Sequence, residues 1–217
     1  MNGSTELVNH MGTPLTIVNT ARVSFGKNSE EMGDREWGLI RYLIRNKHSS
    51  PFRHCSFQFR IVAPVFVIRQ WQKHQVGCAW NEVSGRYVVF DDCDHWEHQE
   101  WRGHSDNLKQ GSIGPFDCPE ADGVYEDAMR LSWQAYSRLL ELGVCREQAR
   151  TVLPLSLMTQ CVWTASLQAV VHFLKLRTDS HAQAEIRVFA DGVRTLIESI
   201  SPDYERLLAI MVDGKEL

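Results

Sequence analysis

A polar stretch from Arg69 to Tyr87, RQWQKHQVGCAWNEVSGRY, holds the residue types that a small-molecule site requires. Its first part follows an apolar run and is rich in helix-forming residues. If this part is helical, Gln70, Lys73 and His74 share one face, because residues three and four positions apart are neighbours on a helix. The spacing therefore predicts that an amide, an ammonium group and an imidazole face the same way.

The second part of the stretch, NEVSGRY, predicts a change to extended backbone. Successive side chains of a strand alternate in direction, so Glu82, Ser84 and Arg86 would point to one side. Gly85 would let a ligand approach bare backbone N–H groups, and the planar fork of the Arg86 guanidinium suits a phosphate. These groups together predict a site for an anionic small molecule that forms hydrogen bonds.

A second polar motif, LRTDSHAQAE, contains Arg177 and His181 four positions apart. The two side chains would face the same way if helical geometry continues across the junction between two helices. Arg177 has no acidic neighbour on its own face, which favours an external anionic partner over a structural ion pair. The alternative is that Asp179 or Glu185 pairs with Arg177.

The composition is that of a folded chain with mixed α and β structure. Its 217 residues are 43% hydrophobic, which is enough for one well-cored domain over residues 1–217. The formal net charge of −4 argues against a nucleic-acid partner, since no excess of Lys and Arg is present to contact a phosphate backbone. Any anion must therefore be bound by local cations.

Further classes of protein and of site are excluded by the cysteines, the apolar runs and the metal-binding residue types. The six cysteines include no CxxC pair, which predicts reduced thiols without a disulfide framework. The N-terminus lacks an apolar signal segment and the run from Ile61 to Ile68 is too short to span a bilayer, so we expect a cytoplasmic protein without a membrane partner. The cluster from Asp91 to His104 holds possible metal ligands, but its spacing matches no zinc pattern and we predict no metal site.

Periodicity and turn residues predict the elements that carry these motifs. β-branched and aromatic residues indicate strands, whereas amphipathic spacing indicates helices. The predicted elements are a strand at Glu6–Met11, a helix from Pro14 to Arg22, a helix from an N-cap at Asp34 to Asn46, a loop at His48–His54, a strand at Phe57–Ile61, an irregular connection at Lys109–Gly123, a helix from an N-cap at Asp122 to Leu142, a helical segment at Arg146–Val152, a strand at Ser156–Ser166, and helices at Leu167–Leu176 and His181–Ile200.

The motifs resemble those of the flavin-dependent thymidylate synthases. In that family Arg-His-Arg is followed seven residues later by Ser, inside a run that ends Asn-Glu-x-Ser-Gly-Arg-Tyr. The resemblance covers most of the chain, through ELVNHMG, ARVSF, HSSPFRH, ARTVLPLSL and LKLRTDSHAQAEI. The core motif is altered, because Lys73-His74-Gln75 replaces Arg-His-Arg and eight residues, Val76 to Val83, precede Ser84.

The resemblance implies an α/β (α+β) fold, with a mostly antiparallel sheet flanked by helices, and a homotetramer whose active sites are shared between subunits. It implies an enzyme that binds FAD, takes reducing equivalents from NADPH and a one-carbon unit from methylenetetrahydrofolate, and methylates C5 of a uracil nucleotide. No Ser-His-Asp set or glycine-rich phosphate loop is recognisable, so a cofactor must supply the reaction. No cysteine nucleophile is required.

By the same resemblance, the catalytic residues are Arg177, Ser84 and His74. A fixed Arg177 guanidinium would stabilise negative charge that develops on the pyrimidine, and His74 would lie against the flavin ring. The resemblance assigns nucleotide binding to Gln70, Lys73, Glu82, Ser84, Gly85, Arg86, Arg150 and Arg177, and cofactor binding to Ser24, Ser50, Arg53, Lys73, His74, Gln75, Ser166, Gln168, His172, Leu176 and His181.

The departures from the family pattern indicate a specialised member. Lys73 keeps a charge but lacks the bidentate fork, and Gln75 lacks both, so positive charge has moved towards Arg53. The extra residue in Val76–Trp80 would lengthen a loop beside the nucleotide, which predicts that a ribonucleotide is tolerated. The pattern is similar to the UMP C5-methylases of polyoxin-type nucleoside-antibiotic pathways. The alternatives are an ordinary dUMP methylase, a uridylate hydroxymethylase, and a nucleotide-binding protein without catalysis.

Overall fold

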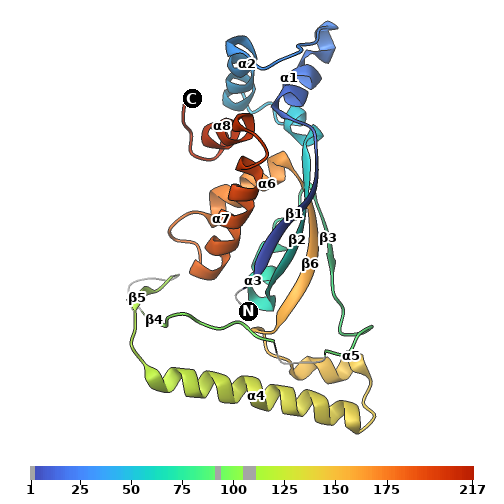
Figure 1. Cartoon of the computed structure of the whole chain (residues 1–217), viewed down its shortest axis with the longest axis vertical. Helices are drawn as coiled ribbons and strands as arrows, with labels where there is room; N and C mark the ends of the chain where they lie inside the picture. The colour runs from blue at the N-terminus through green and yellow to red at the C-terminus, as the bar shows by residue number, and fades with distance from the viewer. Residues whose placement is uncertain (1–2, 91–93, 105–110) are drawn as a thin grey trace. The chain divides into compact units, whose positions relative to one another are not determined.

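The structure is a computed structural model that describes residues 3–90, 94–104 and 111–217 (Figure 1). It contains both helices and strands, as the sequence predicts. In chain order, its elements are β1 (Ser4–Met11), α1 (Pro14–Arg22), the 3₁₀ helix η1 (Val23–Phe25), α2 (Asp34–Arg45), η2 (Ser50–His54), β2 (Ser56–Pro64), α3 (Val65–Trp71), β3 (Cys78–Glu82), β4 (Arg102–Gly103), β5 (Ile113–Pro115), α4 (Pro119–Glu141), α5 (Arg146–Ala149), η3 (Arg150–Val152), β6 (Met158–Ser166), α6 (Leu167–Arg177), α7 (Ala184–Glu198) and α8 (Pro202–Met211).

The contacts divide the chain into two compact units, which we describe separately. Unit 1 comprises Met1–Ser4, Val62–Arg69 and Glu82–Cys161, and unit 2 comprises Thr5–Ile61, Gln70–Asn81 and Val162–Leu217. Unit 2 holds most of a four-stranded antiparallel sheet with the strand order β1-β2-β6-β3. Helices α6, α7 and α8 of this unit pack one against the next beside the sheet (Figure 1).

The core of unit 2 is aromatic. Trp71 stacks on Phe173 with ring centroids 4.4 Å apart, and Trp163 approaches Trp71 edge-on at 5.1 Å. All three rings are almost fully buried, as is Phe59 on the neighbouring strand. Large rings bury much apolar area, and edge and stacked pairs add stabilisation, so this cluster fixes α3 and α6 against β6.

Local sequence determines where several helices begin. Thr13 caps α1 in a reciprocal capping box with Thr16, and Pro14 takes the first helical position. Ser166 caps α6, because its hydroxyl accepts a hydrogen bond from the N–H of Ala169 at 3.3 Å. Ser201 caps α8 in the same way. These caps satisfy N–H groups that lack a partner within the helix.

Unit 1 contains the long helix α4, which ends where the sequence predicts and begins earlier. It ends before Gly143, whose φ of +83° suits glycine. It begins at Pro119 rather than after Asp122, because proline at the first helical position needs no N–H partner. The irregular connection predicted up to Gly123 is therefore wrong for its last residues, and it also contains β5.

The predicted strands and most of the predicted helices are confirmed, with corrections at their ends. The N-cap of α2 is Gly33, and Asp34 is the first helical residue, where its negative charge suits the helix dipole. The loop predicted at His48–His54 contains η2. The prediction had no helix at α8. The single-domain organisation stays a prediction.

Three predicted alignments of polar side chains are wrong. Helix α3 ends at Trp71, so Lys73 and His74 lie in the turn that follows it and do not share a helical face with Gln70. Strand β3 ends at Glu82, so Ser84 and Arg86 lie in a turn and not on a strand face. Helix α6 ends at Arg177, and His181 lies in the connection to α7.

Two classes of feature are missing from the described residues. No helix among them is long and apolar enough to cross a membrane. No group of three or more His, Cys, Asp or Glu residues within the described ranges is arranged to hold a metal ion, although Asp91–Cys93 of the predicted cluster lie outside these ranges.

Candidate active site

A cavity of about 380 Å³ in unit 2 brings together residues from four segments. Arg53 comes from η2, Lys73, His74 and Gln75 from the turn after α3, and the remainder from β6 and α6. The complete lining is Arg53, Lys73, His74, Gln75, Val76, Gly77, Ser166, Gln168, Ala169 and His172. Seven of these were assigned to cofactor binding by resemblance: Arg53, Lys73, His74, Gln75, Ser166, Gln168 and His172.

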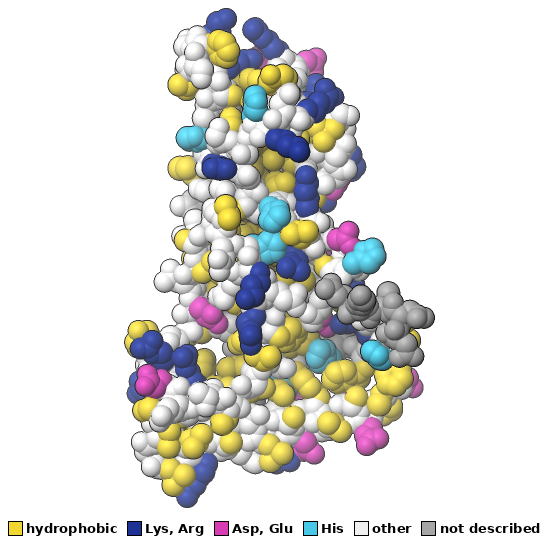
Figure 2. All heavy atoms as spheres, turned by 180° about the vertical axis from the view of Figure 1, so that it is seen from behind, with side chains coloured by type: hydrophobic (Ala, Val, Ile, Leu, Met, Phe, Trp, Pro, Cys, Tyr) yellow, Lys and Arg dark blue, Asp and Glu magenta, His cyan; other side chains and the backbone are white. Residues whose placement is uncertain are grey.

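The cavity is electropositive and rich in hydrogen-bonding groups. Arg53 donates from Nε to Oε1 of Gln168 at 2.6 Å, which holds the guanidinium at the wall. The ammonium group of Lys73 has no partner among the described residues. The N-terminus of α6 also borders the cavity, and its dipole favours negative charge. Figure 2 shows histidine side chains beside lysine and arginine side chains on one face, so local cations are available despite the net charge of −4.

The altered core motif is fixed to this cavity by Gly77. Its φ of +76° is in the left-handed region, and its carbonyl accepts a hydrogen bond from the Ser166 N–H at 3.0 Å. A Cβ at this position would lie 2.8 Å from Oγ of Ser166. The lengthened loop therefore forms part of the wall of this cavity. Its position beside the nucleotide stays a prediction.

His74 is the most buried polar residue of the cavity and contacts Arg177. Arg177 donates from Nε to Nε2 of His74 at 3.1 Å. Burial, with contributions from Arg177 and His172, lowers the pKa of His74 to about 4. The imidazole is therefore neutral at physiological pH. The alternative in which Asp179 pairs with Arg177 is wrong, because Asp179 contacts His181 at 2.8 Å instead.

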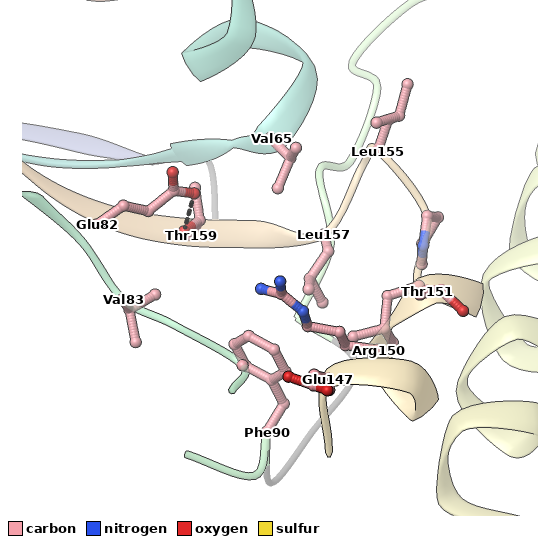
Figure 3. A pocket seen from close by; sticks show the side chains of 13 residues that line it. Val65, Glu82, Val83, Phe90, Glu147, Arg150, Thr151, Leu155, Leu157 and Thr159 are labelled. Atoms are coloured by element: carbon pink, nitrogen blue, oxygen red, sulfur yellow. Dashed lines mark hydrogen bonds between the residues drawn. The ribbon is translucent and has the colours of Figure 1, made fainter. Parts of the chain in front are cut away.

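A second cavity, of about 290 Å³, lies in unit 1 (Figure 3). Glu82, Gly85 and Arg150 of the predicted nucleotide-binding residues line it. The hydroxyl of Thr159 donates to Oε1 of Glu82 at 2.9 Å, which orients this carboxylate. In Figure 3 the Arg150 side chain extends into the cavity between Leu157 and Phe90. Its guanidinium forms no hydrogen bond or ion pair with another described residue.

The turn after β3 places Arg86 near this cavity without pairing it tightly. The carbonyl of Ser84 accepts from the N–H groups of Tyr87 and Val88 at 2.9 and 3.1 Å, which closes the turn. Nε of Arg86 lies 3.9 Å from a carboxylate oxygen of Glu147, and both side chains are exposed. A pair of this length and exposure contributes little, so Arg86 is available to an anion.

Gly85 has a structural role within the protein, and its predicted role in the approach of a ligand stays a prediction. A Cβ at this position would lie 2.7 Å from Cε2 of Phe90 and 3.2 Å from Cδ of Arg150. The glycine therefore leaves room for side chains of the protein itself. Phe90 and Thr159 were missed by sequence reasoning, although the polar Thr159 interrupts the apolar side of a predicted strand and was a usable signal.

The remaining predicted residues do not line either cavity. Ser24, Ser50, Leu176 and His181 are exposed in unit 2. Gln70 hydrogen-bonds the side chain of Gln183 at the start of α7. Gln183 was not predicted, although it belongs to the LRTDSHAQAE motif.

Two buried cysteines, Cys55 and Cys161, and the half-buried Cys78 are not activated nucleophiles. Burial raises the pKa of Cys55 to about 11, and burial together with Glu82 raises the pKa of Cys161 to about 12. Burial also raises the pKa of Cys78, whose Sγ contacts the carbonyl of Val76. A thiol reacts as the thiolate, so these three are unreactive at neutral pH.

The structure is that of an α/β protein with two cavities, one lined by Arg53 and Lys73 and the other lined by Arg150. Residues 6–203 match the family model described as "Thymidylate synthase complementing protein". The chain is 40% identical to a flavin-dependent thymidylate synthase from Kosmotoga olearia over 98% of this chain and 93% of the relative, and 38% identical to one from Thermus thermophilus over 92% and 73%. The chain therefore belongs to the family of the flavin-dependent thymidylate synthases.

A solved structure is also similar. The UMP/dUMP methylase PolB from Streptomyces cacaoi, bound with 5-Br dUMP, superposes with a TM-score of 0.83 at 30% identity and covers 97% of this chain and 96% of that one. The predicted family and its antiparallel α/β fold are thus confirmed. The protein is a methyltransferase-type enzyme that acts on C5 of a uracil nucleotide and uses FAD.

The unit 2 cavity fits a flavin dinucleotide on its own chemistry. Arg53, the unpaired Lys73 and the N-terminus of α6 suit the pyrophosphate, and the neutral His74 ring offers an uncharged surface to a planar ring system. The loss of two motif arginines is thereby compensated in part, because cations remain on the same wall.

Proposed function

We propose that the protein reductively methylates C5 of both dUMP and UMP, with methylenetetrahydrofolate as carbon donor and NADPH as reductant. The methylene carbon bonds to C5 of uracil as its C–N bonds to the folate break, which releases tetrahydrofolate. The C5 proton leaves, and a hydride equivalent reduces the transferred carbon to a methyl group. FAD, when bound, passes the reducing equivalents of NADPH to the transferred carbon. The residues of the chain bind, orient and stabilise charge.

The observation that carries this proposal is the unit 2 cavity. Residues from η2, the turn after α3, β6 and α6 are distant in sequence, yet seven residues matched to the flavin site line one cavity. Arg53 and Lys73 both place positive charge on the wall of this cavity, and like charges repel each other unless an anion lies between them. Their presence therefore favours a bound anionic cofactor. The cavity therefore supports a catalyst over a nucleotide-binding protein without catalysis.

The unit 1 cavity supplies the phosphate contacts in this proposal. Arg150, which has no hydrogen-bond or ionic partner among the described residues, and Arg86, which is held only loosely, can each form charge-assisted hydrogen bonds to a 5′-phosphate. Glu82 is oriented by Thr159 and accepts hydrogen bonds from ribose or base N–H and O–H groups.

The proposal of two substrates rests on the similarity to named relatives. A relative named a flavin-dependent thymidylate synthase is 40% identical to the chain, which supports dUMP, and the UMP/dUMP methylase at 30% identity supports UMP. Val76 and Gly77 line the unit 2 cavity, and the effect of the inserted residue on the ribose stays a prediction. A role in nucleoside-antibiotic biosynthesis stays a prediction from the altered motif.

Turnover of dUMP and UMP in parallel tests the proposal. Purified protein is reconstituted with FAD and incubated with NADPH, methylenetetrahydrofolate and each nucleotide, and products are identified by mass. We expect yellow protein that forms the 5-methyl nucleotide from both substrates. A 5-hydroxymethyl product would show that the carbon is transferred without reduction. A product from dUMP alone would identify an ordinary thymidylate synthase. Protein that does not bind FAD, and therefore stays colourless, would contradict catalysis.

A further inference from the structure

The guanidinium of Arg177 is held by one hydrogen bond, and its acceptor is an imidazole. Arg177 is the last residue of α6, and its Nε donates to Nε2 of His74 at 3.1 Å. No carboxylate within the described part of the chain pairs with this guanidinium. An arginine that is half-buried beside a neutral ring, and not beside an acid, keeps its full positive charge available.

His74 is itself rigidly held, so its acceptor atom has a fixed place. Only 8% of the residue is exposed, and its ring is nearly perpendicular to that of Phe173, with centroids 5.3 Å apart. Its backbone N–H donates to the carbonyl of Trp71 at 3.0 Å, which anchors the turn after α3 to the aromatic core. The position of Nε2 is therefore set by buried packing.

The hydrogen bond leaves a defined part of Arg177 free. A guanidinium carries five N–H groups in one plane, and Nε is the single donor on the side of the aliphatic stem. When Nε–H is directed at His74, the plane is fixed and the two Nη atoms at the far end keep their parallel N–H groups. Such an edge binds a planar acceptor with two hydrogen bonds.

We propose that His74 is a positioning residue for Arg177, which it orients so that the free Nη edge meets the carbonyl or ionised imide of the uracil ring. This inference rests on the proposed function. Charge develops on that ring as C5 becomes nucleophilic, and a donor already aimed at it avoids reorganisation during the reaction. His74 thus acts on the nucleotide through Arg177, in addition to lining the cofactor cavity.

The contact requires one tautomer of His74. An Nε2 atom that accepts a hydrogen bond carries no proton, so the ring proton must lie on Nδ1. ¹⁵N NMR of imidazole-labelled protein, with the His74 signal assigned from His74→Gln, measures this directly and without turnover. We expect the Nδ1–H tautomer in wild-type protein and a mixture of tautomers in Arg177→Ala. A predominant Nε2–H tautomer in the wild type would overturn the proposal.

Two substitutions that differ by one methylene group test the role in catalysis. The amide oxygen of glutamine reaches about as far as Nε2, whereas that of asparagine reaches only as far as Nδ1. At matched FAD content and saturating dUMP, we expect His74→Asn and His74→Phe to lower kcat by about 10- to 100-fold, the usual cost of a misplaced catalytic group. His74→Gln should recover most of this loss, and equal losses in the Gln and Asn variants would contradict the proposal.

A double-mutant cycle separates positioning from a direct role of the imidazole. Arg177→Ala alone should lower kcat by about 10²- to 10³-fold, as for other single electrostatic contacts. If His74 acts through Arg177, His74→Phe should lower kcat by less than about threefold further in the Arg177→Ala protein. Losses that multiply would overturn the inference. Absence of methylation in the wild type would instead contradict the proposed function, while the tautomer would still decide whether the contact exists.

Discussion

At the level of single residues, Gly85 matters for the room that it leaves to Phe90 and Arg150. Its Cβ position is only 2.7 Å from the Phe90 ring and 3.2 Å from the Arg150 stem. An added methyl group must therefore displace one of two side chains that line the unit 1 cavity.

We expect Gly85→Ala to weaken nucleotide binding by about 10- to 100-fold, since loss of one charge-assisted hydrogen bond costs roughly 1.5–3 kcal/mol. Isothermal titration with dUMP measures the change. The matched control is Gly123→Ala in α4, where a Cβ would meet nothing within 4 Å. Unchanged affinity in Gly85→Ala, with a fold intact by circular dichroism, would show that Arg150 does not hold the phosphate.

The buried His74 makes stability depend on pH. Its pKa is lowered from 6.5 to about 4 in the folded protein, so below pH 6.5 the unfolded chain takes up a proton that the folded protein does not. His74 therefore contributes its full stabilisation of the folded state above pH 6.5 and progressively less as the pH falls towards 4. Arg177 and His172 act in the same direction, because both disfavour a second positive charge.

From this group we expect the free energy of unfolding to fall by on the order of 1–2 kcal/mol between pH 7 and pH 5. Urea unfolding at the two pH values measures it. His74→Gln should flatten this dependence, whereas His54→Gln, at an exposed position, should leave it unchanged. Equal slopes for the wild type and His74→Gln would show that the folded protein accommodates the imidazolium.

At the level of elements, strands and helices were predictable, whereas the turns that carry the polar residues were not. The apolar alternation of β2 and the N-terminal signals of α1 are local, so the sequence contains them. Arg177 and His181 were placed on one face because helix periodicity was extended through Thr178. In the structure the Thr178 hydroxyl donates to the carbonyl of Leu174, and Asp179 accepts from the N–H of His181, which ends the helix.

In the candidate site, too, some features could be predicted from the sequence and others could not. Seven residues that line the unit 2 cavity could be predicted as one set, because resemblance transfers residue by residue. The contact between His74 and Arg177 could not, since it joins positions 103 residues apart and depends on a turn geometry that no local pattern specifies. The polar pair TD in LRTDSHAQAE was the available warning, because both residues favour turns and caps.

Gly77, in the turn after α3, shapes the inserted loop. Gly77 combines a φ of +76° with a Cβ position 2.8 Å from the hydroxyl that caps α6. We expect Gly77→Ala to lower the FAD affinity by at least about 10-fold, because it displaces the loop that forms the cavity wall. Flavin fluorescence titration of FAD-free protein measures the affinity.

Gly214→Ala is the matched control for this substitution. Its φ of +72° imposes the same backbone strain, yet nothing lies within 4 Å of its Cβ position. A loss of FAD affinity in both variants would indicate general destabilisation. Normal FAD affinity in Gly77→Ala would show that the loop does not shape the cofactor site.

At the level of the whole molecule, we expect some predicted site residues to contact a cofactor that is bound by a second copy of the chain. Ser24, Ser50, Leu176 and His181 resemble cofactor-binding residues but do not line the cavity of their own chain. Ser24 lies in η1 between Val23 and Phe25, which are 71% and 77% exposed. Large apolar side chains that are exposed next to a polar site residue are typical of an interface between subunits.

We therefore predict a homotetramer in which η1 of one subunit completes the cofactor site of another. Light scattering on a sizing column should give roughly four times the chain mass of 24.9 kDa. Phe25→Asp places a charge in the predicted interface and should both dissociate the tetramer and lower FAD affinity by at least about 10-fold, because burial of an unpaired charge is costly. Leu217→Asp, at an exposed apolar position at the chain end, should change neither. A Phe25→Asp protein that dissociates but binds FAD normally would show that each subunit holds its cofactor alone, and a monomeric wild type would contradict the assembly itself.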